Sequence, residues 1–168
     1  MTRHVLSVLV TNRPGVLTRV SGLFARRGYN IESLTVSPTD DPSESRMTIG
    51  VNVVSAQALE QIVKQLNKHS EVHKIVELEP SAVTRELVLV KVRSDVENRS
   101  KIIDTVALFR AKAVDVSLES LTIEATGGRE KLDALLQMLE PFGIIELVQS
   151  GQVALNRGAA ALGAKRSG

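Results

Sequence analysis

The order of apolar patterns along this chain predicts an α+β protein in which one unit of strand, helix, two strands, helix and strand occurs twice. Short runs rich in valine, leucine and isoleucine, typical of strands, occur in the same order on either side of residues 79–81. Longer segments with apolar residues at helical spacing follow the first and third strand of each half. The halves also resemble each other locally, since Leu59-Glu60-Gln61-Ile62-Val63 compares with Leu132-Asp133-Ala134-Leu135-Leu136.

The first half begins with an apolar run at residues 5–10, which predicts a strand covered on at least one face. The helix after it carries an apolar stripe formed by Val16, Leu17, Val20, Leu23 and Phe24. Gly28 is placed for a left-handed cap at the end of this helix, and Leu34 and Val36 alternate in a second strand. Residues 38–45 contain no apolar side chain and predict an exposed loop.

The remainder of the first half completes the pattern. Residues 46–53 alternate apolar and polar side chains, residues 56–69 have helical spacing with Ser55 as a candidate cap, and residues 72–78 predict a last strand. This order is that of a ferredoxin-like βαββαβ domain, in which both helices cover one face of an antiparallel sheet.

The second half repeats this order in every element. Strands are predicted at residues 87–92, 114–118, 121–125 and 144–148, and helices at residues 98–111 and around Leu132, Leu135, Leu136 and Leu139, with Pro141 ending the last helix. The segment Glu79-Pro80-Ser81 is the expected joint, because proline cannot continue a strand ladder. We therefore predict two tandem ferredoxin-like domains, at residues 1–79 and 80–157, and a flexible tail at residues 158–168.

Composition excludes several classes of protein. No apolar run approaches the roughly 20 residues that span a bilayer, and the first residues lead directly into a strand without a signal segment. The chain contains no cysteine, which excludes disulfides and thiolate chemistry and fits a cytoplasmic protein. Its 21 basic and 19 acidic residues are interspersed, so the surface has no polyanion-seeking block.

The chemistry-bearing residues exclude further functions. Histidine occurs only at positions 4, 69 and 73, and without cysteine this set predicts no zinc site. No serine, threonine or other nucleophile stands in a recognisable catalytic motif. RNA binding by this fold uses aromatic residues on the central strands, which are absent from residues 5–10 and 47–53. Gly127-Gly128-Arg129 lacks phosphate-loop spacing and is interpreted as a turn.

The turn between the first strand and the first helix could bind an anion. Pro14 suits the first helical turn, and Gly15 has no Cβ to shield the neighbouring N–H groups. A helix N-terminus of this kind can hold a carboxylate. A strand-turn-helix junction without a ligand is the alternative, which the motif by itself favours.

An α-amino acid would fit such a turn. N–H groups near Gly15 and Val16 could take its carboxylate, while Asn12 or Asn30 could accept from its ammonium group. Val16, Leu17 and Ile31 are the nearby apolar candidates for contact with an aliphatic side chain. The alternatives are a helix cap at Asn12 and a turn after Gly28 at Asn30, and both remain open at this point.

Longer motifs resemble a known family. Asn12-Arg13-Pro14-Gly15-Val16-Leu17 resembles the strand-turn-helix signature of ACT domains, which bind amino acids and regulate metabolic enzymes. The run Gly28-Tyr29-Asn30-Ile31-Glu32-Ser33-Leu34-Thr35-Val36, together with Ser45-Arg46-Met47-Thr48-Ile49, resembles the regulatory subunits of acetolactate synthase, also called acetohydroxyacid synthase. The resemblance continues through segments such as Lys131-Leu132-Asp133-Ala134 and covers nearly the whole chain.

The resemblance implies a non-catalytic subunit that activates a catalytic partner and confers feedback inhibition by valine in branched-chain amino acid biosynthesis. It also implies an N-terminal ACT domain, a C-terminal ACT-like domain and a homodimer with the effector bound between the ACT domains. One protomer would offer Asn12, Gly15 and Val16, and the other Asn30 and Ile31 with Ser37 nearby. Ser37 stands where the family often has alanine. The second half lacks the Asn-x-Pro-Gly turn and has an acidic loop at residues 94–97, so it is not expected to bind the same ligand.

The resemblance implies that this chain holds no cofactor, and that thiamine diphosphate, Mg and FAD belong to the catalytic subunit. No nucleic acid or membrane partner is expected, and residues 35–47 are the expected contact surface for the catalytic subunit. The rival interpretations are an ACT protein of another pathway, a transcriptional regulator with a fused sensor, and a small ferredoxin-like enzyme. No helix-turn-helix segment is visible in the sequence to support the regulator.

Overall fold

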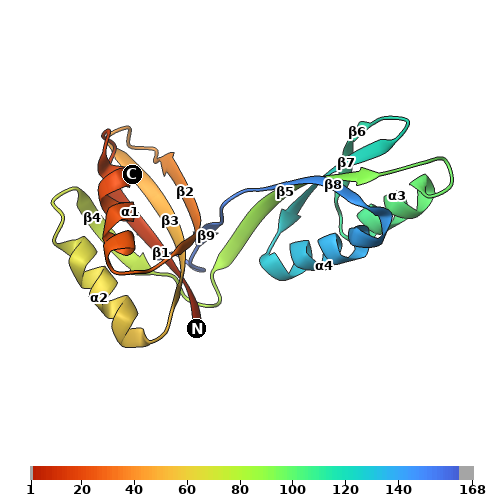
Figure 1. Ribbon diagram of the computed structural model, residues 1–168. Coiled ribbons are helices and arrows are strands. Elements are labelled where there is room, and N and C mark those ends of the chain that lie inside the picture. Colours follow the sequence, from red (N-terminus) through yellow and green to blue (C-terminus); the bar gives the residue numbers. More distant parts are fainter. Residues whose placement is uncertain (1, 163–168) are drawn as a thin grey trace. The chain divides into compact units, whose positions relative to one another are not determined.

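The computed structural model describes residues 2–162 of the chain. The chain divides into two compact units. The first unit comprises the chain through Val83 together with the segment that begins at Gln152, and the second spans Thr84–Gly151. Each unit is built around an antiparallel sheet with two helices, as Figure 1 shows. Among residues 2–162, we find no helix with the length and apolar composition that a membrane span requires.

The first unit contains β1 (Thr2–Thr11), α1 (Val16–Arg26), β2 (Ile31–Pro38), β3 (Glu44–Val53), α2 (Ala56–Asn67), β4 (Val72–Glu77) and the short strand β9 (Val153–Leu155). Its sheet has the order β2-β3-β1-β4, and every neighbouring pair is antiparallel. Strands β2 and β4 are therefore the edges of the sheet. Because β1 and β2 are both antiparallel to β3, they run in the same direction.

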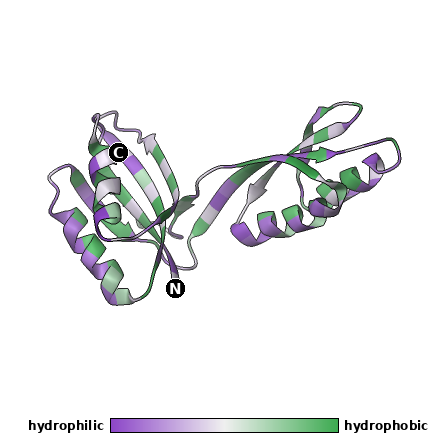
Figure 2. Ribbon diagram, viewed as in Figure 1, coloured by the Kyte–Doolittle hydropathy of each residue, from purple (hydrophilic) through white to green (hydrophobic). Residues whose placement is uncertain are grey.

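One face of this sheet packs on the two helices. The core residues of β1 and β3 alternate along each strand, as expected for a sheet with one helix-covered face. The helices contribute their apolar stripes, and Figure 2 shows the alternation of hydrophobic and hydrophilic residues along α2. The buried residues of this hydrophobic core are Leu6, Val8, Val10, Val16, Val20, Leu23, Phe24, Met47, Ile49, Val51, Val53, Leu59, Ile62 and Leu66.

The second unit repeats the arrangement with β5 (Val83–Arg93), α3 (Arg99–Leu108), β6 (Lys112–Val116), β7 (Ser120–Gly127), α4 (Arg129–Leu139), a short 3-10 helix η1 (Glu140–Phe142) and β8 (Ile144–Gln149). Its sheet order is β6-β7-β5-β8, which corresponds strand for strand to the order in the first unit. Its separate core contains Val88, Val90, Val92, Ile102, Val106, Leu121, Ile123, Ala125, Leu132, Leu135 and Leu139.

The predicted α+β fold with two βαββαβ units is confirmed, as are three local signals. Gly28 has a φ of 73° after the end of α1, where a left-handed residue was predicted. The Ser55 hydroxyl caps α2 by accepting a hydrogen bond from the N–H of Ala58 at 3.1 Å. Gly128 is the N-cap residue of α4, in agreement with a turn at that place.

The C-terminal segment differs from the sequence prediction. The predicted boundaries were residues 79/80 and 157/158, whereas the compact units divide at Val83/Thr84 and Gly151/Gln152. Residues 152–157 group with the first unit, and β9 was not predicted. Of the predicted tail, residues 158–162 belong to the described chain and residues 163–168 lie outside it. No periodic apolar pattern marks this segment, because its contacts are with strands far away in the sequence.

Candidate functional site

The turn between β1 and α1 is held by main-chain hydrogen bonds. The N–H of Asn12 donates to the carbonyl of Ser43 at 2.8 Å, and the N–H of Arg13 donates to the carbonyl of Thr11 at 3.0 Å. Gly15 is the N-cap residue, with φ 89° and ψ −16°, and no described side chain caps the helix there. Pro14 therefore precedes the helix, which corrects its predicted place in the first helical turn. The left-handed conformation explains why this position needs glycine.

Charge at this helix start favours an anion. The first turn of α1 contains no acidic residue, and the helix dipole adds partial positive charge there. Arg19 lies one turn further on and donates two hydrogen bonds to the Glu71 carboxylate, at 2.7 and 2.6 Å. An ideal Cβ added to Gly15 would lie 3.0 Å from Arg19 Nη1. The absence of a side chain at residue 15 thus leaves room for the Arg19 guanidinium beside the helix start.

Asn12 does not cap the helix, because Gly15 holds the N-cap position. The Asn12 side chain instead donates from Nδ2 to the carbonyl of Pro42 at 3.0 Å. This bond ties the β1–α1 turn to the loop before β3. It directs the amide so that Oδ1 is the atom left to accept from a ligand, since the described residues provide no donor to it.

The apolar candidates at this turn separate into two kinds. Val16 is buried in the core and offers only its main chain to a ligand. Leu17, in contrast, is 44% exposed beside it. Leu17 is therefore the side chain of α1 that a bound aliphatic group could contact.

Asn30, Ile31 and Ser37 lie on or beside the edge strand β2. Asn30 is exposed before the strand, Ile31 is half-buried against the core, and Ser37 is exposed near the end of the strand. Along β3, Ile31 pairs with Val51 and Ser37 pairs with Arg46. Ser37 therefore lies at the end of the sheet where Asn12 and Gly15 are found.

The other two candidates lie at the opposite end of the sheet. The last residue of β1, Thr11, pairs with Glu44, and Ile31 pairs with Val51, seven residues further along β3. At about 3.3 Å per residue this is a separation of roughly 23 Å. One chain thus brings Ser37 toward Asn12 and Gly15, and it keeps Asn30 and Ile31 away from them.

The edge position of β2 offers a way to bring these residues together. Two antiparallel β2 strands related by a two-fold axis would set the beginning of one strand beside the end of the other. Asn30 and Ile31 of one chain would then lie at the end of the partner sheet that carries the β1–α1 turn. Within one chain, these candidate residues therefore do not form a single site.

The second unit closes the corresponding place with its own carboxylate. Asp95 precedes α3, and its Oδ1 accepts hydrogen bonds from the N–H groups of Glu97 and Asn98 at 2.9 and 2.8 Å. The negative charge of Asp95 just before this helix start disfavours a carboxylate ligand there. The acidic character of residues 94–97 signalled this difference, while the role of Asp95 itself was not predicted.

Two of the three histidines, His4 and His73, contact glutamate side chains of the first sheet. His73 Nδ1 lies 2.6 Å from the Glu44 carboxylate, and its Nε2 lies 2.9 Å from the Thr11 hydroxyl. His4 contacts Glu77 in the same way. Within residues 2–162 no three histidine, aspartate or glutamate side chains gather in a geometry that could hold a metal.

The repeated βαββαβ units define a protein of two tandem ferredoxin-like domains. Residues 6–74 match the family described as AHAS small subunit-like ACT domain, and residues 85–158 match the family described as small subunit of acetolactate synthase. The chain belongs to the acetolactate synthase small-subunit family, as its resemblance in sequence implied.

Relatives along the full length agree with this assignment. The chain is 59% identical over 164 residues to the acetolactate synthase small subunit of Mycolicibacterium smegmatis, covering 97% of this chain and 96% of that protein. It is 47% identical to a probable acetolactate synthase small subunit of Archaeoglobus fulgidus, covering 93% and 98% of the two chains. The crystal structure of the acetolactate synthase small subunit from Thermotoga maritima superposes with a TM-score of 0.87 at 41% identity, covering 95% of this chain and all of that one.

Proposed function

We propose that this chain binds the thiamine-diphosphate-dependent catalytic subunit of an acetolactate synthase, raises its activity and makes it sensitive to inhibition by valine. Membership in the small-subunit family and the ACT domain at residues 6–74 support a regulatory rather than a catalytic role. In this proposal the thiamine diphosphate, Mg and FAD are held by the catalytic subunit, and this chain holds no cofactor.

We place the valine site between the first units of two chains. The observation that carries this is the separation of roughly 23 Å between the two halves of the candidate site within one chain. Antiparallel pairing of two β2 edges would remove that separation, so the site would form only in a homodimer. Such a homodimer would contain two equivalent sites.

Each candidate residue then has a physical role. N–H groups near Gly15 take the valine carboxylate, and the Asn12 amide oxygen and Asn30 of the second chain accept from the ammonium group. Leu17 and Ile31 border the isopropyl group, and Ser37 lies beside it. Because the ligand touches two chains, it stabilises one dimer arrangement over another, which is the condition for regulation. A coupling free energy of about 1–3 kcal/mol would account for typical regulation.

Substitution of Gly15 by aspartate tests this site. In Gly15→Asp a carboxylate would stand where the valine carboxylate is bound, so we expect the concentration of valine for half-inhibition to rise about tenfold or more. Activation of the catalytic subunit should persist, because the change is confined to the turn. The measurement is acetolactate formation by the catalytic subunit, alone and with each variant, over a valine titration.

Gly15→Ala is the matched control, since it adds the Cβ and the strain at φ 89° without the charge. We expect Gly15→Ala to remain more sensitive to valine than Gly15→Asp. Valine inhibition of the Gly15→Asp complex at the wild-type concentration would show that the site is misplaced. Failure of the wild-type chain to change the activity of the catalytic subunit would refute the proposed function as a whole.

Substitution of Asn30 tests the contribution of the second chain. Because Asn30 is exposed and lies outside the core, Asn30→Ala should weaken valine binding more than it weakens dimerisation. Calorimetric titration with valine and sedimentation of the same variant measure the two effects. Equal weakening of both would indicate a structural role for this residue.

A further inference from the structure

The C-terminal segment lies against the face of the first sheet that the helices leave uncovered. Arg46 Nη2 donates to the carbonyl of Ala154 at 3.3 Å, and Arg3 Nη2 donates to the amide oxygen of Gln152 at 3.1 Å. Arg46 is followed on β3 by the core residue Met47, so Arg46 itself points to the opposite face. Gln152 and Ala154 are buried.

Two further hydrogen bonds hold the segment beyond β9. The N–H of Glu79 donates to Asn156 Oδ1 at 3.0 Å, and Arg157 Nε donates to the carbonyl of Ser81 at 2.7 Å. These bonds attach the chain after β9 to the residues that follow β4. The segment is therefore an integral part of the first unit rather than a loose end.

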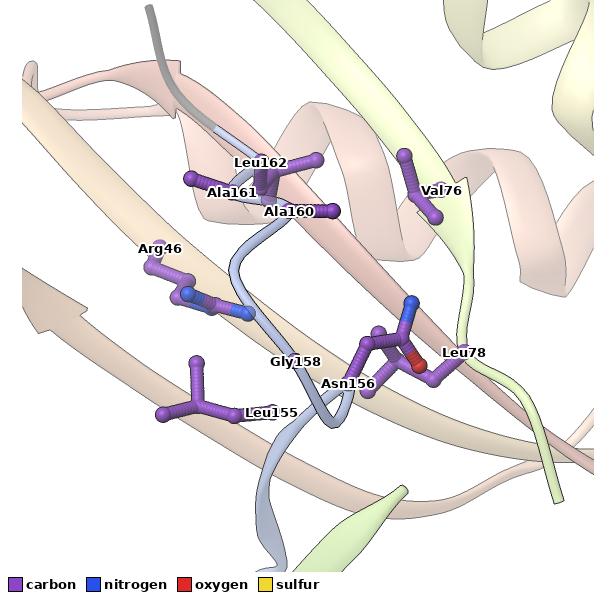
Figure 3. A pocket seen from close by; sticks show the side chains of 9 residues that line it. All are labelled: Arg46, Val76, Leu78, Leu155, Asn156, Gly158, Ala160, Ala161 and Leu162. Atoms are coloured by element: carbon purple, nitrogen blue, oxygen red, sulfur yellow. The ribbon is translucent and has the colours of Figure 1, made fainter. Parts of the chain in front are cut away.

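A pocket of about 460 Å³ lies between this segment and strands β3 and β4. In Figure 3, Arg46 reaches in from β3, Val76 and Leu78 stand on the side of β4, and the C-terminal segment passes between them. The lining also includes Leu155, Asn156, Gly158, Ala160, Ala161 and Leu162. This volume lies within the usual range for small-molecule sites.

Arg46 is the charged side chain in the pocket lining, and few hydrogen-bond acceptors balance its positive charge. The guanidinium is partly buried, and burial lowers the pKa of Arg46 from its ordinary value. Its partner among the described residues is the single carbonyl of Ala154, and no described carboxylate lies within ion-pair distance. A partly desolvated cation with one neutral acceptor leaves donors directed at the pocket, which an anion would satisfy.

The remaining lining sets the kind of anion. Asn156 uses its Oδ1 to accept from the main chain, so its Nδ2 is a second donor at the pocket wall. The other side chains of the lining are valine, leucine and alanine. No aspartate or glutamate is present in the lining to accept from an ammonium group.

We propose that this pocket binds a small aliphatic carboxylate without an ammonium group, with its carboxylate on Arg46 and Asn156 and its hydrocarbon part against Val76, Leu78 and Leu162. The site is separate from the candidate valine site, whose residues do not line the pocket, and the proposal does not depend on the function proposed above.

Calorimetric titration of the full chain with 3-methylbutanoate, its amide and an amino acid tests the class of ligand. We expect 3-methylbutanoate to bind, and we expect 3-methylbutanamide, which lacks the charge, to bind at least about tenfold more weakly. L-Leucine, which has an ammonium group and one further methylene, should likewise bind at least about tenfold more weakly at this site. L-Valine, which is 3-methylbutanoate with an added ammonium group, should leave the 3-methylbutanoate affinity unchanged at equal concentration.

Substitutions in the pocket test its location. Arg46→Gln should weaken 3-methylbutanoate binding by about tenfold or more. Lys74→Gln is the matched control. Leu9 of β1 pairs with Arg46 on β3 and with Lys74 on β4, so the two cations flank the same residue. Lys74 is exposed and does not line the pocket. This control removes the same charge from the same sheet and should bind as the wild type does.

Ala160→Phe provides a variant that leaves the sheet intact, since residue 160 lies on the C-terminal segment and lines the pocket. The larger side chain should fill the space and abolish binding. The proposal is overturned by any of four results: no binding of 3-methylbutanoate, equal binding of the amide, unchanged binding to both pocket variants, or displacement by valine.

Discussion

Helices α1 and α3 occupy equivalent places in the two units, and each is followed by a residue in the left-handed conformation. In the first unit this residue is a glycine, and in the second it is an arginine. Gly28 follows α1 with a φ of 73°, and Arg110 follows α3 with a φ of 54°. Both donate the same kind of closing hydrogen bond, from Gly28 to Ala25 at 3.0 Å and from Arg110 to Ala107 at 3.1 Å. A residue with a Cβ pays about 1–2 kcal/mol for this left-handed conformation, which glycine adopts freely. The second unit therefore carries strain that the first unit avoids.

Arg110→Gly should accordingly stabilise the protein. We expect a gain of up to about 1 kcal/mol in the free energy of unfolding. The strain energy that is relieved exceeds the stability lost because glycine gives the unfolded chain more conformational entropy. Urea unfolding followed by circular dichroism measures it.

The reverse substitution is the control. Gly28→Ala should lose about 1 kcal/mol from strain alone, since no described atom lies within 4 Å of the added Cβ. A loss of stability in Arg110→Gly would show that the arginine side chain makes a contribution larger than its strain.

At the scale of elements, the two units use the same strand-turn-helix connection differently. In the first unit a glycine opens the start of α1 and leaves the helix without a side-chain cap from the described residues. In the second unit Asp95 supplies two hydrogen bonds to the N–H groups before α3. The first helix start therefore favours an external carboxylate, whereas the charge of Asp95 next to the second disfavours one.

Removal of the Asp95 carboxylate should destabilise the second unit. We expect Asp95→Ala to lose about 1 kcal/mol in the free energy of unfolding, as for other capping residues. Asp95→Asn should lose less, because its amide oxygen still accepts hydrogen bonds.

Glu97→Ala serves as the control in the same loop, since Glu97 is exposed and contributes its main-chain N–H to the motif. It should change the stability by less than about 0.5 kcal/mol. Equal losses in Asp95→Ala and Glu97→Ala would indicate general charge effects rather than a cap.

For the whole molecule, the decisive feature is the return of the C-terminal segment to the first unit. A chain that was expected to end in the second domain places Gln152 and Ala154 in buried positions of the first. The described part of the C-terminus therefore contributes to the stability of the domain that carries the candidate effector site.

Neighbouring positions in β9 offer a test of this contribution. Ala154 is 6% exposed and Val153 is 51% exposed. Ala154→Leu should cost about 1–3 kcal/mol by overpacking a buried position, and Val153→Leu should be nearly neutral. The measurement is the thermal unfolding midpoint of each full-length variant. Equal midpoints for the two variants would contradict a packed C-terminal segment.

The secondary-structure elements could be predicted from the sequence more completely than the candidate site. The alternation of Met47, Ile49, Val51 and Val53 and the apolar stripes of the helices were sufficient for both βαββαβ units. The left-handed conformation at Gly28 was also predicted, because glycine adopts it readily, whereas that at Gly15 was not, since Pro14 was expected in the first helical turn. The role of Asp95 was not predicted, since an acidic loop does not specify which carboxylate binds the main chain.

Local patterns in the sequence were sufficient to predict the order of the elements, their buried faces and the family, because periodicity and turn chemistry are local properties of the chain. The folded structure was needed to show which distant segments meet. It placed Asn30 and Ile31 at the opposite end of the sheet from Asn12 and Gly15, and it joined residues 152–162 to the first unit around Arg46. Strand register and long-range burial depend on pairs of residues far apart in the chain, and no local pattern encodes such a pair.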